Sequence, residues 1–318
     1  MRKTEPHQKW LSSTPPSTGP VAGGVAILAA FAWYETRVAH PSLDVRLFRD
    51  RRLSASVGAI GLVFFGMGGV YFFIAFYLQN VRGYSPLQAG LLTVPFAIGQ
   101  LLFSPRSASL VARYGAKAAG AAGMFVMAGA IAAYATLGTA SPIWLLAVFF
   151  GIQGAAMGVV MPAATAAIMD VVPRERAGAG SALTNTSRQV AVALSVAILG
   201  SILAGLYRNA LNPALTGLPS AAKSAASSSI TATQAVAQQL GPAGRSLLGP
   251  ANDAFVHSMH ITTLIAAALA LAGGFVVLRW MPGKPKPAAE IATASEDSYE
   301  DELAIMEENM LKTADREG

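Results

Sequence analysis

The chain has 318 residues, of which 53% are hydrophobic and 13% are charged, and it contains no cysteine. Soluble globular proteins carry roughly 25% charged residues, so this composition excludes an ordinary soluble domain, and the lack of cysteine excludes disulfides and thiolate metal sites. The net charge of +6 does not indicate nucleic-acid binding, because the basic residues lie between apolar runs and not in a patch on a polar domain.

The chain divides into apolar runs and polar connections. Residues 1–19 are polar and rich in Pro, Ser and Thr, which predicts a disordered N-terminal segment. A helix needs about 20 apolar residues to cross a bilayer. We therefore predict an all-α, polytopic bundle with spans at 20–38, 54–79, 87–105, 118–138, 142–165, 184–206 and 257–281. The first span is the weakest, because its apolar run is short and meets Glu35 and Arg37.

The connections differ in composition. A basic loop at 39–53 follows the first span, and an acidic tail at 282–318 follows the last. A long connection at 209–255 is rich in Ala, Ser and Gln; it is expected to hold short helices near 220–240 but shows no clear apolar face. From Leu53 to Asn252 the only carboxylates are Asp170 and Glu175. No carboxylate therefore lies deep in a span, where proton-coupled steps usually place one.

The basic residues alternate between the two sides of the predicted bundle. They are concentrated at 37–52, 106–117, 174–176 and 279–286. The positive-inside rule makes these connections cytoplasmic, together with the C-terminal tail. Seven spans would then place the N-terminus outside, although Arg2, Lys3 and Lys9 favour the inside. The alternatives are that 20–38 does not span, or that it is a signal peptide, for which no small-residue cleavage site follows.

Aromatic and amide side chains within the spans predict a substrate cavity. Tyr71 and Tyr77 lie in an aromatic run near the outer end of 54–79. Such residues either form a belt at the membrane surface or line a cavity for lipophilic or cationic ligands. Gln100 and Gln153 lie inside apolar runs, so each must face another helix or a wet cavity. An interhelical hydrogen bond and a ligand contact remain alternative roles for both.

Polar residues also gather at the start of the span 184–206. Asn185, Arg188 and Gln189 have the spacing i, i+3 and i+4, which places them on one face of a helix. We assign Asn185 and Gln189 to the cavity lining. Arg188 is interpreted as a gate or helix anchor, and snorkelling to lipid headgroups is the alternative.

The sequence offers little support for other chemistry. Asp253, His257 and His260 resemble metal ligands in their spacing, but no fourth ligand lies nearby. We predict no metal and no cofactor. No phosphate-binding glycine loop, serine elbow or zinc motif is present, so no enzymatic activity is predicted.

Several stretches resemble a known family. They are Pro41-Ser-Leu-Asp-Val-Arg-Leu-Phe48, Phe76-Tyr-Leu-Gln-Asn80, Gly83-Tyr-Ser-Pro-Leu-Gln-Ala-Gly90 and Gly178-Ala-Gly-Ser-Ala-Leu-Thr-Asn-Thr-Ser-Arg-Gln189. They are similar to the 14-helix drug:proton antiporter branch of the major facilitator superfamily. The resemblance covers about residues 20–282 and implies the C-terminal half of that fold: one linker helix at 20–38 and a six-helix domain at 54–281.

The resemblance also implies roles for individual segments. The spans 54–79, 87–105, 142–165 and 184–206 would line a central cavity, and 118–138 and 257–281 would be peripheral. The family's cytoplasmic loop motif runs Gly, Asp, Arg, Gly, and here the first two places hold Ala108 and Ala112. Arg113 retains the motif's cation, so we assign it, like Arg188, to a gate or helix anchor.

The expected function is multidrug efflux across the bacterial inner membrane, with small lipophilic or cationic substrates and the lipid bilayer as partners. Alternating access rocks two halves about a midplane site. Full activity is therefore expected only with a partner N-terminal half or a second copy of this chain. The alternatives are a truncated non-transporting membrane protein and a subunit of a split transporter. A retinal-type receptor is disfavoured, because the last span offers no lysine.

Overall fold

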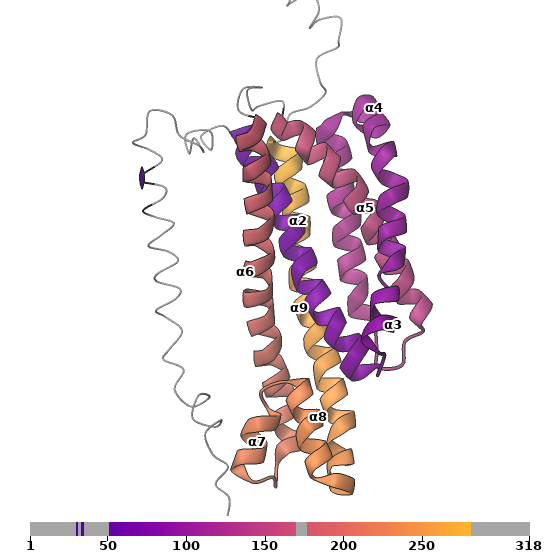
Figure 1. Ribbon diagram of the computed structural model, residues 1–318, viewed down its shortest axis with the longest axis vertical. Coiled ribbons are helices and arrows are strands. Elements are labelled where there is room, and N and C mark those ends of the chain that lie inside the picture. Colours follow the sequence, from indigo (N-terminus) through magenta and orange to yellow (C-terminus); the bar gives the residue numbers. More distant parts are fainter. Residues whose placement is uncertain (1–29, 31–32, 35–50, 170–176, 281–318) are drawn as a thin grey trace, which may run out of the picture.

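The computed structural model describes residues 30, 33–34, 51–169 and 177–280 (Figure 1). The predicted N-terminal segment 1–19 and acidic tail lie outside these residues. So do nearly all of the span 20–38 and most of the basic loop 39–53. Within the described residues the regular secondary structure is entirely helical, as the sequence predicts.

The described helices follow the predicted spans. In chain order they are α2 (Arg51–Phe76), α3 (Pro86–Leu91), α4 (Val94–Ala133), α5 (Ile143–Met169), α6 (Ala177–Leu211), α7 (Ser220–Ala226), α8 (Ile230–Gln239) and α9 (Leu248–Trp280). A π-helical turn (Tyr77–Val81) extends α2. Five helical stretches in the described part of the chain are long and apolar enough to cross a membrane.

Two of the predicted spans, 87–105 and nearly all of 118–138, lie within one of those stretches, Pro86–Thr136. Its main helix, α4, has 40 residues and would be about 60 Å long if straight, twice the roughly 30 Å apolar core of a bilayer. At Gly115 the backbone leaves the helical region (φ 86°, ψ 155°), a conformation that glycine adopts readily. The two halves of α4 therefore meet at a single residue, which replaces the longer loop expected at 106–117.

Small residues allow the helices to pack closely. The sequence places Gly154 and Gly158 one turn apart on α5, a spacing that favours close helix approach. A methyl group at Gly154 would lie 2.0 Å from the carbonyl oxygen of Phe96, and one at Gly158 would lie 2.9 Å from that of Gln100. These glycines therefore allow α4 to approach α5 closely. Next to this pair, α6 packs on α2, and α9 contacts α2, α4 and α6 (Figure 1).

The connection predicted at 209–255 folds into a helical cap, defined here as residues 212–247. The cap contains α7 and α8, which confirms the short helices expected near 220–240. The expectation that this region lacks an apolar face is wrong: Ile230, Thr233, Val236 and Ala237 are all buried along one side of α8. Small side chains make up half of that face, so its hydropathy is weak in the sequence. The cap lies at the end of the bundle opposite the turn between the two halves of α4 (Figure 1).

Candidate functional site

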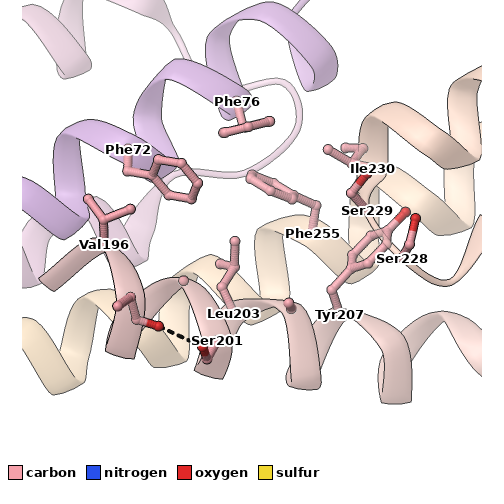
Figure 2. Close-up of a pocket in the computed structure, with 13 residues that line it drawn as sticks. Phe72, Phe76, Val196, Ser201, Leu203, Tyr207, Ser228, Ser229, Ile230 and Phe255 are labelled. Atoms are coloured by element: carbon pink, nitrogen blue, oxygen red, sulfur yellow. Dashed lines mark hydrogen bonds between the residues drawn. The ribbon is translucent and has the colours of Figure 1, made fainter. Parts of the chain in front are cut away.

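A pocket of about 390 Å³ lies between α2, α6 and the cap. Figure 2 shows Phe72 and Phe76 of α2 on one side and residues of α6 on the other. Ser228, Ser229 and Ile230 of the cap and Phe255 of α9 complete the lining. The volume falls within the range of about 300–1,000 Å³ typical of small-molecule sites.

The walls of this pocket are held together by close packing of α2 and α6. A methyl group at Gly68 would lie 3.2 Å from the Cα atom of Val192, and Gly69 faces Ser195 and Leu199. The Ser195 hydroxyl donates a hydrogen bond to the Phe65 carbonyl across this contact. Because the helices touch here, the bulkier Phe72 and Phe76, one and two turns further along α2, lie where the pocket opens.

The pocket surface is almost wholly apolar, because its hydroxyl groups bond to protein atoms. Ser201 donates to the Ala197 carbonyl (2.6 Å), and Ser228 donates to the Ala225 carbonyl (2.8 Å). The Tyr207 hydroxyl lies 2.7 Å from the Thr233 hydroxyl, which links α6 to the cap. The groups that are left free to contact a ligand are aromatic faces and aliphatic groups. Such a lining suits a lipophilic molecule, and aromatic faces also attract a delocalised cation.

The two predicted tyrosines lie away from this pocket. The ring of Tyr71 packs against Phe96 of α4 and Phe150 of α5, with centroid separations of 5.8 and 5.7 Å. Tyr77 is 2% exposed, and its hydroxyl donates to the Gly138 carbonyl at 2.7 Å. Both side chains therefore connect α2 to the α4–α5 side of the bundle.

The predicted glutamines lie on that same side. Gln153 is fully buried and accepts a hydrogen bond from the Tyr134 hydroxyl at 3.1 Å. The Gln153 Nε2 atom has no hydrogen-bond partner among the described residues. Gln100 is half-buried on α4, next to the contact with Gly158. An interhelical hydrogen bond, one of the two roles considered for these amides, is present at Gln153.

The predicted polar face at the start of α6 is present. Arg188 donates to the Asn185 side-chain oxygen at 2.6 Å, and its guanidinium carbon lies 5.4 Å from the centre of the Phe64 ring on α2. Gln189 is exposed beside them. These residues lie at the opposite end of α6 from the pocket, so the structure does not bring them together with it.

The remaining predicted residues occupy separate places. Arg113 is exposed just before the Gly115 break, with its guanidinium carbon 5.3 Å from the centre of the Tyr114 ring. His260 lies 2.7 Å from the Leu137 carbonyl, so it connects α9 to the loop after α4.

The sequence pattern alone did not distinguish Phe72 and Phe76 as pocket residues from the other members of the aromatic run. They belong to the same aromatic run as Tyr71 and Tyr77, but they are spaced i and i+4 and therefore share a different face of α2. That spacing is visible in the sequence. Which of the two faces meets α6 depends on helix packing, and the sequence pattern does not determine it.

Comparison with known proteins agrees with this architecture. The chain is 33% identical over 188 residues to the multidrug resistance protein Stp of Mycobacterium tuberculosis, covering 59% of this chain and 35% of that protein. It is 32% identical over 259 residues to the multidrug efflux pump LfrA of Mycolicibacterium smegmatis, covering 80% of this chain and 51% of that pump. The chain thus spans about half the length, or less, of these relatives.

The fold also matches a solved transporter. A crystal structure of a bacterial homologue of the human lysosomal transporter Spinster, in an inward-facing and unoccupied conformation, superposes with a TM-score of 0.53. The match has 21% identity and covers 76% of this chain and 52% of that one. A model of the Major Facilitator Superfamily matches residues 10–196. Since this match covers more than half of the chain, the protein belongs to the Major Facilitator Superfamily.

Proposed function

We propose that this chain is the C-terminal half of a drug efflux transporter, and that the pocket between α2 and α6 contacts the transported molecule. The observation that carries the proposal is the apolar, aromatic lining of that pocket. The relatives named for multidrug resistance and efflux support it. A broad, apolar site with few directional hydrogen bonds suits substrates of varied shape.

Alternating access needs a second wall. Major facilitator transporters rock two halves about a midplane site, and this chain matches about half of LfrA. We propose that an N-terminal half, or a second copy of this chain, completes the cavity. The only carboxylate among the described residues, that of Asp253, lies near the start of α9 and outside the predicted span 257–281, so proton coupling would rely on that partner.

The proposed orientation follows the positive-inside rule. The Gly115 break, the start of α6 and the C-terminal tail would face the bacterial cytoplasm, and the cap would face outward. Arg188, bonded to Asn185 and stacked on Phe64, would anchor or gate the cytoplasmic end of the α2–α6 pair. Asn185 and Gln189 would line the cytoplasmic mouth of the cavity. The outward-facing wall of the cavity would be supported by side chains that pack behind its lining, namely Gln100, Gln153, Tyr71 and Tyr77.

Ligand binding can be tested without transport. The purified chain should bind a fluorescent lipophilic cation, measured by fluorescence anisotropy. Replacing Phe72 and Phe76 with Leu keeps an apolar lining but removes both aromatic faces, which should weaken binding by about 0.5–2 kcal/mol per ring. Phe275→Leu is the matched control, because Phe275 is a 63% exposed aromatic on α9. Equal binding by all three proteins would contradict the proposed site.

The second candidate function is that of a non-transporting membrane protein or a regulatory subunit. It would be favoured if the purified, folded chain bound no lipophilic cation and gave no efflux with any N-terminal half. The two candidates therefore differ in a direct binding measurement and in a transport measurement.

A further inference from the structure

A second depression lies on the opposite flank of the bundle, between the two halves of α4 and α5. This groove has a volume of about 730 Å³ and is lined almost entirely by apolar atoms. Phe103, Leu110 and Tyr114 come from α4 before the Gly115 break, and Ala118, Ala122 and Val126 come from α4 after it. Small residues of α5, such as Gly151 and Ala155, form its floor.

The groove has the length of one membrane leaflet. It begins near the reversal at Gly115 and follows α4 from Tyr114 back to Phe103. Eleven residues of helix rise about 16 Å, which is close to half of the roughly 30 Å apolar core of a bilayer. An acyl chain of this length would therefore fill the groove.

The mouth of the groove is basic. Arg113 is exposed and lies over the ring of Tyr114, which itself lines the groove. Lys117 follows directly after the break. Among the described residues the only carboxylate side chain is that of Asp253, which belongs to the start of α9 at the other end of the bundle (Figure 1). An apolar groove of leaflet length with two cations at its mouth is complementary to an anionic phospholipid.

We propose that the groove binds an anionic phospholipid, with an acyl chain between the two halves of α4 and the phosphate-bearing headgroup on Arg113 and Lys117. The site is separate from the α2–α6 pocket and does not depend on the transport function. Basic residues next to a membrane favour anionic lipid by about fivefold in affinity for each charge. The lipid would occupy the concave side of the Gly115 reversal and hold the two halves of α4 at a fixed separation.

The test is a lipid titration of the full, delipidated chain in detergent, read by native mass spectrometry. Dioleoyl phosphatidylglycerol and dioleoyl phosphatidylcholine have the same acyl chains and differ in headgroup charge. We expect the first lipid bound to be the anionic one, with an affinity at least about fivefold higher. Equal affinity for the two lipids would overturn the headgroup assignment.

Two variants separate the headgroup from the acyl chain. Arg113→Gln with Lys117→Gln should remove the preference for phosphatidylglycerol and leave phosphatidylcholine binding unchanged. Ala122→Leu fills the groove and should weaken binding of both lipids. Arg208→Gln with Lys223→Gln is the matched control, because it removes the same charge from the cap end of the protein.

The contrary results are equally specific. The proposal fails if the preference survives the Arg113/Lys117 change, or if the Arg208/Lys223 control abolishes it equally. It also fails if Ala122→Leu leaves both affinities unchanged. Thermal unfolding of each variant in lipid-free detergent checks whether the fold is intact. We expect it to be intact, because Arg113 and Ala122 are both exposed.

Discussion

The hydroxyl of Tyr134 donates a hydrogen bond to Gln153 Oε1 across 3.1 Å, and neither side chain is exposed. The bond joins the turn that follows α4 to the middle of α5. Gln153 Nε2 has no hydrogen-bond partner among the described residues, so only the oxygen of the amide is hydrogen-bonded. Removing the Tyr134 hydroxyl would leave the whole amide unpaired in an apolar interior, which costs about 1–3 kcal/mol.

This pair predicts a non-additive stability series. Tyr134→Phe should destabilise the protein by about 1–2 kcal/mol. Adding Gln153→Met to Tyr134→Phe should recover most of that loss, because it replaces the unpaired amide with an apolar side chain of similar length. Thermal unfolding in detergent measures both. Additive destabilisation by the two changes would show that the amide is satisfied in some other way.

A second prediction concerns the contact between α4 and α5. Gly154→Ala places a methyl group 2.0 Å from the Phe96 carbonyl oxygen, so the helix backbones must separate at a cost of about 1–3 kcal/mol. Gly129→Ala on α4 is the matched control, since no atom lies within 4 Å of its new methyl group. Unfolding temperatures should fall for the first variant only. A similar fall in both variants would mean that these helices do not tolerate an added methyl group, whether or not it lies at the α4–α5 contact.

A third prediction concerns the cap. Thr233 links α8 to α6 through Tyr207, and its hydroxyl also donates to the Ala226 carbonyl at 2.7 Å. Thr233→Val should cost the cap about 1–3 kcal/mol, because two buried polar partners lose their bond. Hydrogen exchange should therefore accelerate in 220–247 while the protection of α2 and α5 stays unchanged. Thr216→Val is the control, because Thr216 is an exposed cap residue whose hydroxyl bonds to the Pro213 carbonyl within its own turn. Unchanged exchange in the Thr233 variant would mean that other contacts hold the cap.

A fourth prediction concerns orientation. The chain has no cysteine, so single cysteines report on topology without background. Ser224→Cys on the cap should react with a membrane-impermeant maleimide on intact cells, and Ser181→Cys near the start of α6 should react only after permeabilisation. Both serines are exposed. The reverse pattern would invert the proposed topology and place the basic mouth of the lipid groove outside.

The features predicted correctly from sequence are those set by local pattern. Apolar length locates the described spans, the spacing of Gly154 and Gly158 predicts a face of α5 that another helix can approach closely, and the i, i+3 spacing predicts that Asn185 and Arg188 share a face. Each depends on helix period and on side-chain size alone.

The features missed depend on tertiary packing. Whether Tyr71 or Phe72 faces the pocket is decided by the rotation of α2, which the close contact of Gly68 and Gly69 with α6 fixes. The buried face of α8 is assembled largely from small side chains, whose hydropathy gives little signal. The reversal at Gly115 requires only one residue, so it resembles any other glycine within a helix.

The most direct test of the central claim is efflux of a lipophilic cationic dye from cells that lack their own pumps. This chain would be expressed alone and together with the N-terminal half of a relative such as LfrA, with membrane insertion verified by the cysteine labelling. We predict proton-gradient-dependent efflux only in co-expression, and its loss when Phe72 and Phe76 are replaced by Leu. Efflux by the chain alone would contradict the proposal that an N-terminal half completes the cavity, and efflux that survives the Phe72/Phe76 change would contradict the assigned pocket.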